Sequence, residues 1–171
     1  ALKEIHFPSS PELLVKAKSR LGFDEIFKFQ ANGLIRKKQL EGKTSHVIPA
    51  LIRKVVERYD PIEVWGDGKE MKDLIYIDDF IEGLIKAFIK INKYSPVNIG
   101  TGKSVSVNKI LNKILNIEKY DNAKIKHNLA KPTMIKKRVL NVNFARKILN
   151  FSSSITLGEG LTKTINWYKS K

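Results

Sequence analysis

The fold of this chain is decided by the stretch Val64-Trp65-Gly66-Asp67-Gly68-Lys69-Glu70-Met71-Lys72-Asp73-Leu74-Ile75-Tyr76-Ile77-Asp78-Asp79-Phe80. The segment Ile62-Glu63-Val64-Trp65 is predicted to be a strand, closed by the glycine–aspartate–glycine turn that follows it. A second short strand is predicted at Leu74–Ile77, where apolar and β-branched residues recur. Asp78 or Asp79 is then expected to cap a helix with apolar residues at helical spacing.

The segments on either side continue this alternation of helices and strands. The predicted elements are a helix through Val47, Leu51 and Val55, a strand at residues 96–99, a helix capped by Ser106, short strands at 124–126 and 138–140, and a last helix opened by the capping box of Thr156 and Glu159. An N-terminal helical segment precedes them. The fold class predicted is therefore α/β, a small mixed lobe of short strands and helices without a complete Rossmann domain.

Composition limits the possible functions. With 171 residues and 42% hydrophobic content, the chain has the size of one ordinary domain, or of a domain with an appendage. The sequence contains no cysteine, which excludes disulfides and thiol catalysis. His6 and His127 have no partners at metal-ligand spacing, so no metal site is expected. No apolar run is long enough to span a bilayer, and the first residues lack the apolar core of a signal peptide. We expect a cytoplasmic protein without a membrane partner.

The chain is strongly basic. It carries 32 basic and 17 acidic side chains, a net charge of +15, which favours anionic partners such as phosphorylated metabolites or nucleic acid. Most lysines alternate with Ile, Leu and Asn, a pattern typical of solvated helix surfaces. The cluster Arg36-Lys37-Lys38 offers contacts to nucleic-acid phosphates, and a nucleic-acid-binding module stays open as an alternative.

The run Gly100-Thr101-Gly102-Lys103-Ser104 invites comparison with a nucleotide-binding phosphate loop. That loop needs a glycine five residues before the glycine of its Gly-Lys-Ser end, and this position is Val97. We therefore predict an ordinary turn between two elements.

From Ser45 onward, short motifs stand in a fixed order: Ser45-His46-Val47-Ile48-Pro49, the Trp65 stretch, Tyr76-Ile77-Asp78-Asp79, Val97-Asn98-Ile99-Gly100, Lys131-Pro132-Thr133 with Arg138-Val139-Leu140, and Gly158-Glu159-Gly160-Leu161. In this order they resemble the substrate-binding, C-terminal lobe of the NAD-dependent epimerase/dehydratase family, which are oxidoreductases of the extended short-chain dehydrogenase type. The resemblance is greatest to the GDP-L-fucose synthases. It implies a sugar-nucleotide ligand, with GDP-linked sugars preferred.

The resemblance also implies particular site residues. His46 matches an acid used in epimerising a 4-keto sugar, a task that imidazole suits. The implied substrate-binding positions are Val47, Leu51, Trp65, Lys72 and Arg138. Lys72 replaces the arginine usual in the family, so a bidentate phosphate contact is lost, and Asn141 stands where aspartate is common.

The cofactor of the complete family is NADP, but none is expected to bind this chain alone. No glycine-rich turn after a strand precedes His46, and the serine and Tyr-x-x-x-Lys pair with which the family moves protons are not expected here. Hydride chemistry depends on the cofactor, so whether the chain is itself an enzyme stays open. We expect a substrate-binding part that is inactive alone.

The first residues resemble something else. Residues 1–8 and 17–27 are similar to the segment that joins the DNA-binding wedge and the motor of the RecG ATP-dependent DNA helicase. We predict two parts, a helical segment at 1–43 and the sugar-nucleotide lobe at 44–171, joined as a chimera. Without a Rossmann partner, the helices at 46–58 and 80–90 should expose apolar surface through which copies can self-associate. A folded chimera without any ligand remains a further alternative.

Overall fold

The computed structural model describes residues 46–131 and 135–170. The chain divides into two units, Ala1–Thr44 and Ser45–Lys171, and the account below concerns the second by itself. The predicted N-terminal helical segment, its helicase resemblance and the Arg36-Lys37-Lys38 cluster lie outside the described residues.

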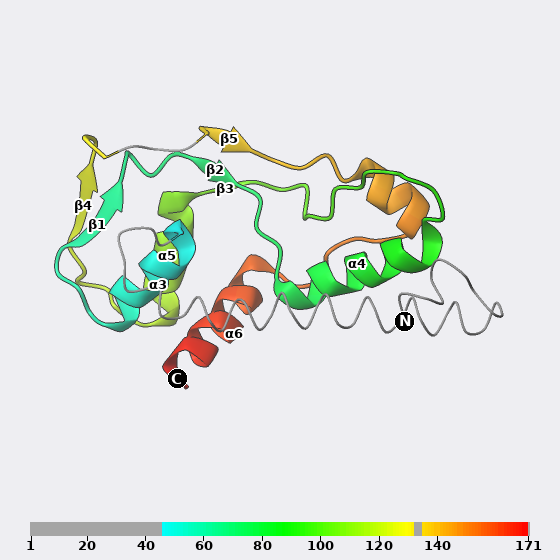
Figure 1. The fold of residues 1–171 in the computed structure, drawn as a ribbon. Helices are drawn as coiled ribbons and strands as arrows, with labels where there is room; N and C mark the ends of the chain where they lie inside the picture. Colours follow the sequence, from blue (N-terminus) through cyan, green and yellow to red (C-terminus); the bar gives the residue numbers. More distant parts are fainter. Residues whose placement is uncertain (1–45, 132–134, 171) are drawn as a thin grey trace, which may run out of the picture. The chain divides into compact units, whose positions relative to one another are not determined.

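Short strands alternate with helices along the described chain (Figure 1). The elements are α3 (Val47–Val56), β1 (Ile62–Trp65), β2 (Met71–Lys72), α4 (Ile77–Lys90), β3 (Val105–Ser106), α5 (Val107–Ile117), β4 (Ile125–Asn128), β5 (Lys137–Arg138), the π-helix η2 (Ala145–Leu149) and α6 (Leu157–Lys169). β1 pairs in parallel with β4, and β2 lies between antiparallel β3 and parallel β5. The α/β prediction is confirmed, and the described residues contain no complete Rossmann domain.

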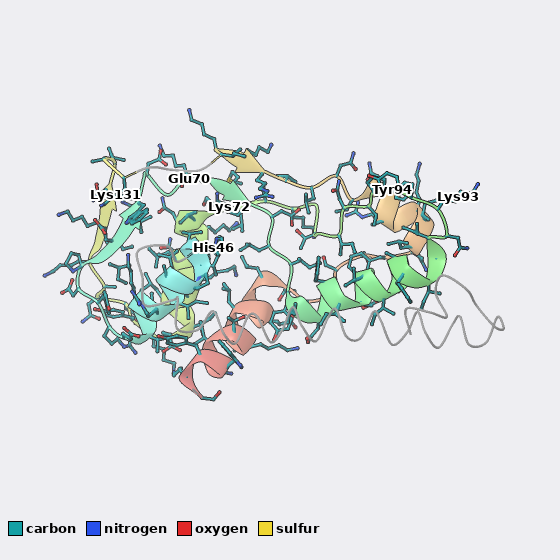
Figure 2. The ribbon with its side chains drawn as sticks, in the orientation of Figure 1. His46, Glu70, Lys72, Lys93, Tyr94 and Lys131 are labelled. Atoms are coloured by element: carbon teal, nitrogen blue, oxygen red, sulfur yellow. The ribbon has the colours of Figure 1, made fainter. Side chains whose placement is uncertain are left out.

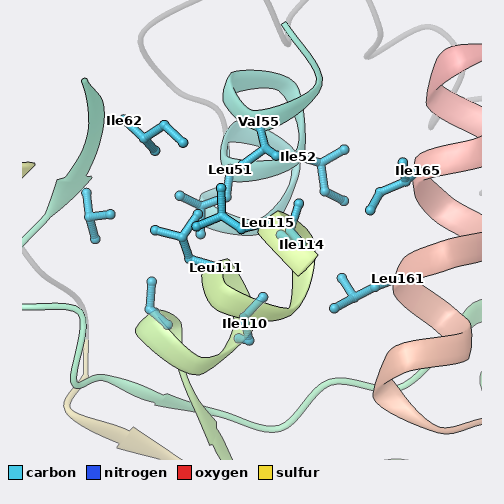
Figure 3. Packing of buried hydrophobic residues seen from close by; sticks show 12 residues of the cluster. Leu51, Ile52, Val55, Ile62, Ile110, Leu111, Ile114, Leu115, Leu161 and Ile165 are labelled. Carbon is cyan, nitrogen blue, oxygen red and sulfur yellow. The ribbon is translucent and has the colours of Figure 1, made fainter. Parts of the chain in front are cut away.

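The main core lies where α3, α5 and α6 meet β1 (Figure 3). Each helix contributes apolar residues three or four positions apart, which places them on one face. The residues labelled in Figure 3 are Leu51, Ile52, Val55, Ile62, Ile110, Leu111, Ile114, Leu115, Leu161 and Ile165. Each such side chain contributes roughly 1.5–3 kcal/mol when fully buried, so this cluster holds α3 in place.

Two predicted helix caps are confirmed. The Ser106 hydroxyl accepts a hydrogen bond from the backbone N–H of Lys109 at the start of α5. At the start of α6, Glu159 N–H donates to the Thr156 hydroxyl over 3.3 Å, and Thr156 N–H donates to the Glu159 carboxylate over 2.8 Å. These reciprocal bonds satisfy N–H groups that a helix start otherwise leaves without partners.

Two predicted strands are wrong. The second strand of the sheet is Met71–Lys72 and not 74–77, because the chain leaves the sheet after Asp73, whose N–H is the last to donate to β5, at Arg138 O. Residues 96–99 form no strand, and a side-chain hydrogen bond from Asn98 to the carbonyl of Asn141 joins them to the segment before η2. The strands predicted at 124–126 and 138–140 are confirmed with shifted bounds, as β4 and β5.

The predicted aspartate cap of α4 is also wrong. The N-cap is Tyr76, whose side chain makes no capping bond. Asp79 is only 2% exposed and turns away from the helix end. Its carboxylate accepts hydrogen bonds from the N–H and hydroxyl of Ser154 and from the N–H of Ile155, over 2.8–3.0 Å. Asp79 thus fastens α4 to the segment that leads into α6.

Helix α4 exposes large apolar side chains and buries small ones. Leu84, Ile85 and Phe88 are 38–45% exposed, whereas Gly83 and Ala87 are buried on the side that packs beside η2 (Figure 1). This matches the apolar surface predicted for residues 80–90. Self-association through it stays a prediction. None of the described helices is long and apolar enough to cross a membrane.

Candidate functional site

The two predicted phosphate-binding cations lie on neighbouring strands. Lys72 of β2 and Arg138 of β5 are Cα partners in a parallel pair, held by backbone bonds from Met71 N to Lys136 O and from Asp73 N to Arg138 O. Register partners of adjacent strands point to the same face of a sheet. The fold therefore brings two cationic side chains together from positions 66 residues apart in sequence, an arrangement suited to an anion with two charges.

Trp65 lies at the end of β1 and is 45% exposed. The ammonium of Lys131 lies 5.5 Å from the centre of its indole ring, within cation–π range (Figure 2). Asn128, the register partner of Trp65, donates to the carboxylate of Glu63 over 2.7 Å. This bond is the chief cause that holds the pKa of Glu63 below its ordinary value, with the Trp65 indole donating as well. The ring is thus held at its edge and covered by a cation on one face.

Lys131 received no role from the sequence. Its partner Trp65 is far away along the chain, and only the parallel pairing of β1 with β4 places the two together. A lysine followed by proline has no spacing signal that points to a ring on another strand.

The three site residues predicted on α3 have different surroundings. His46 is the N-cap residue and its exposed side chain makes no capping bond. Val47 is 37% exposed, whereas Leu51 is 3% exposed and packs in the main core. Figure 2 shows His46 at the start of α3 and Lys72 on β2. Leu51 therefore supports the helix that presents His46 and Val47.

Glu70 is a further residue that sequence reasoning missed. It lies two positions before Lys72 (Figure 2) and is 8% exposed. Within the described part of the chain, its Oε2 atom is buried without a hydrogen-bond partner. Buried carboxylate oxygens are nearly always hydrogen-bonded, so this oxygen calls for a donor from water or from a ligand.

The Gly100–Ser104 run forms a turn that Asp73 holds. The Asp73 carboxylate accepts hydrogen bonds from the N–H groups of Thr101, Gly102 and Leu140 and from the Thr101 hydroxyl. A phosphate-binding loop or a dinucleotide turn would point such N–H groups at a ligand. Here a side chain of the protein already takes them, so this glycine-rich turn does not fit a dinucleotide cofactor.

The Tyr-x-x-x-Lys spacing does occur, contrary to expectation, at Tyr120 and Lys124. Neither residue lies on a helix. The Tyr120 hydroxyl donates to Tyr59 O over 3.3 Å, and the Arg58 guanidinium lies 4.7 Å from the Tyr120 ring centre. Lys124 pairs with Asp60 over 3.7 Å. These contacts join the turn after α5 to the turn before β1, which is a structural use of both residues.

Metal chemistry has no visible site in the described residues. Across 46–131 and 135–170, no three His, Asp or Glu side chains gather in a group that could hold a metal ion. The carboxylates of Asp73 and Asp79 accept hydrogen bonds from donors of the protein itself.

Comparisons with known proteins point to one enzyme family. Residues 33–100 match the model of the NAD dependent epimerase/dehydratase family. The match begins before the predicted boundary at residues 43–44, which stays a prediction. A UDP-glucuronate 4-epimerase from Thermodesulfobacterium geofontis is 36% identical over 64% of this chain and 33% of its own length. A GDP-mannose 3,5-epimerase from Arabidopsis thaliana is 31% identical over 70% of this chain and 31% of its own.

Another relative and a solved structure are also sugar-nucleotide enzymes. A probable GDP-L-fucose synthase from Oryza sativa is 24% identical over 86% of this chain and 45% of its own length. UDP-glucuronic acid 4-epimerase from Bacillus cereus, solved with UDP-glucuronic acid and NAD, is similar with a TM-score of 0.65 and 25% identity, over 74% of this chain and 40% of that one. The chain thus spans about a third to just under half of these relatives. The matches support the epimerase/dehydratase family, with both UDP- and GDP-linked members among the relatives.

Proposed function

We propose that this chain carries the sugar-nucleotide-binding part of an NAD(P)-dependent epimerase or reductase, with a GDP-linked sugar as the preferred ligand. The observation that carries the proposal is the pairing of Lys72 with Arg138 across β2 and β5. The family supported by the comparisons acts on sugars linked to nucleoside diphosphates, as the names of its members state.

Lys72 and Arg138 would bind the diphosphate. Charge-assisted contacts to phosphate are among the strongest hydrogen bonds in proteins. Lys72 supplies a compact point charge, whereas the Arg138 guanidinium supplies a planar fork that matches two phosphate oxygens. Trp65 would stack against the base with its exposed ring, since aromatic faces bind planar rings without regard to their polar edges. Lys131 would then lie beside the same base.

His46 would serve as the acid in epimerisation. It is exposed at the start of α3, so a ligand can reach its imidazole. Val47 follows it on the exposed side of the helix, and Leu51 fixes the helix in the core. An acid on a rigid helix end keeps its position when the ligand binds.

The hydride step lies outside what the described residues can do. NADP supplies the hydride in the complete family, and the glycine-rich turn at residues 100–104, held by Asp73, does not fit it. We therefore propose that the chain binds ligand without turning it over. Detection of NADPH-dependent reduction of a 4-keto-6-deoxy sugar nucleotide by the purified chain would contradict this.

Calorimetric titration with GDP and with UDP tests the proposed ligand. Lys72→Ala and Arg138→Ala should each weaken GDP binding at least about tenfold, because each removes a charge-assisted contact. The double variant should lose less binding free energy than the two single variants lose in sum, since both cations act on one diphosphate. Lys113→Ala, an exposed lysine on α5, is the control and should bind as the parent does. If Lys72→Ala, Arg138→Ala and Lys113→Ala weaken GDP binding equally, the binding is general charge attraction and the proposed site does not exist.

Nucleic-acid binding is a second candidate, and one observation favours it. Residues 122–158 contain no acidic side chain but eight basic ones: Lys124, Lys126, Lys131, Lys136, Lys137, Arg138, Arg146 and Lys147. Part of this run forms the edge strands β4 and β5, where lysines also serve to prevent edge-to-edge aggregation. Binding to single-stranded DNA that falls steeply with salt would support this candidate. No measurable binding at low salt would remove it.

A further inference from the structure

A cavity of about 130 Å³ is lined by none of the residues of the proposed nucleotide site. It forms where the turn at residues 100–103 meets η2 and the segment after it. Lys103 and Arg146 line it with two cations, and Ser152 and Ser153 add two hydroxyl groups. Buried Phe151 is also part of the lining, so a side chain of the core bounds the space.

The two positive charges that line this cavity are not paired with a carboxylate of the lining. Among the described residues, its lining contains no carboxylate, and neither Lys103 nor Arg146 makes an ion pair. The adjacent carboxylate is Asp73, whose two oxygens already accept four hydrogen bonds from Thr101, Gly102 and Leu140. Two like charges that face one small space repel each other, and an anion placed between them removes this cost.

The local backbone presents Arg146 to the cavity. Arg146 belongs to the π-helix η2, a rare conformation that occurs frequently at functional sites. Gly102 has a φ of +70°, and its absent Cβ would stand 3.8 Å from the Arg146 guanidinium. The turn thus passes close to the guanidinium without a side chain in between.

The size and chemistry of the cavity indicate its ligand. Its volume equals that of about four water molecules at roughly 30 Å³ each, which is enough room for a tetrahedral oxyanion. A guanidinium fork, an ammonium and two hydroxyls are donors that phosphate oxygens accept. We propose that this cavity, the Arg146 cavity, is a second anion site that binds the phosphate group of a small molecule through side chains.

This site is distinct from the Lys72–Arg138 pair. Lys72 and Asp73 are consecutive residues of an extended segment, so their side chains point to opposite sides. Lys72 lies on the side of its register partner Arg138, whereas Asp73 contacts Thr101, which lines the Arg146 cavity. A phosphate bound in the cavity therefore does not need the cations of the nucleotide site.

Site-resolved titration tests the proposal. Inorganic phosphate is added to the ¹⁵N-labelled full chain at constant ionic strength, and backbone amide shifts are followed by NMR. We expect saturable shifts at Gly102, Lys103, Ser152 and Ser153. Arg146→Gln and Lys103→Gln should each weaken this binding at least about tenfold, while Lys113→Gln leaves it unchanged. Amide shifts that grow linearly with phosphate concentration, or equal weakening of phosphate binding by Lys113→Gln, would overturn the proposal. Either result would mean that the basic surface attracts anions in general.

Two controls separate this result from other causes. Both cavity cations are exposed, so the variants should keep the thermal melting temperature of the parent. Lys72→Ala should leave the shifts at Gly102 and Ser153 intact. If Lys72→Ala abolishes them, phosphate binds at the nucleotide site and the second site does not exist.

Discussion

Asparagine in place of Asp73 should destabilise the fold more than asparagine in place of Asp79, although Asp79 is the more deeply buried carboxylate. Asp79 is 2% exposed, and Asp73 is half-buried. Each carboxylate joins segments that are distant in sequence. The two differ in how their hydrogen-bond donors are divided between the two oxygens.

At Asp79 the division suits an amide. Oδ2 accepts both backbone N–H groups, from Ser154 and Ile155, and Oδ1 accepts only the Ser154 hydroxyl. An asparagine can place its oxygen at Oδ2 and its NH₂ at Oδ1, and the hydroxyl can turn to accept. All three contacts survive, so only the charge assistance is lost, at a cost of about 1–2 kcal/mol.

At Asp73 no orientation of an amide satisfies every donor. Oδ1 accepts the Thr101 N–H and Oδ2 accepts the N–H groups of Gly102 and Leu140. The best orientation of an asparagine still points its NH₂ at one backbone N–H. A donor left without a partner adds roughly 1–3 kcal/mol to the lost charge assistance, so Asp73→Asn should cost about 2–5 kcal/mol in total.

Urea unfolding followed by far-ultraviolet circular dichroism measures both costs as changes in the free energy of unfolding. Asp79→Ala is the matched control. It leaves two backbone N–H groups without partners and should cost about 2–5 kcal/mol, more than Asp79→Asn. Equal costs for the two asparagine variants, or a larger cost at Asp79, would refute the reasoning from donor geometry and favour burial as the deciding factor.

Two further predictions concern stability. Gly83→Ala should destabilise the fold by about 1–3 kcal/mol, because its Cβ would stand 2.6 Å from Ile99 Cγ2. At Gly158 an added Cβ meets nothing within 4 Å, so Gly158→Ala should stabilise the fold by about 0.5 kcal/mol in thermal melts. A more stable Gly83→Ala than Gly158→Ala variant would contradict the packing described beside α4. Hydrogen bonds from the Thr156 hydroxyl and N–H hold the pKa of Glu159 below its ordinary value. This stabilisation is present above the ordinary pKa and is lost as the pH falls through the lowered one, so Glu159→Gln should flatten the dependence of melting temperature on pH below about 5, and an unchanged slope would exclude this role.

Local signals in the sequence were sufficient for the helices of the core. Ser106 and Thr156 cap their helices through bonds to residues three positions away, so the cap and its partner are read in one short segment. The helix at Val47–Val56 likewise follows from apolar spacing alone. Such elements depend on neighbours in sequence, which is why the prediction holds for them.

Elements that depend on distant partners could not be predicted in this way. The apolar run at 74–77 has strand composition, but the ladder with β5 ends at Asp73, which binds a turn 28 residues away. Asp79 has the position of a helix cap and instead binds residues 75 and 76 positions away. The spacing of residues near Asp73 and Asp79 in the sequence does not indicate these distant partners.

In the candidate site, too, some residues could be predicted from the sequence and others could not. Lys72 and Arg138 were singled out by resemblance, and the register of β2 with β5 places them side by side. Lys131 and Arg146 were not singled out, because a parallel strand pair brings the first to Trp65 and a π-helix brings the second to its cavity. Their roles as ligand-binding residues rest on the experiments above.

We propose that the described lobe binds a nucleoside diphosphate through Lys72 and Arg138, with the exposed ring of Trp65 against the base. The most direct test of this proposal is a titration of tryptophan fluorescence with GDP, and then UDP, in a Trp167→Phe chain, which removes the other tryptophan. We expect saturable quenching by GDP that Lys72→Ala abolishes and Lys113→Ala does not. A flat response from a chain that melts cooperatively would contradict it, because the fold would then persist without the site.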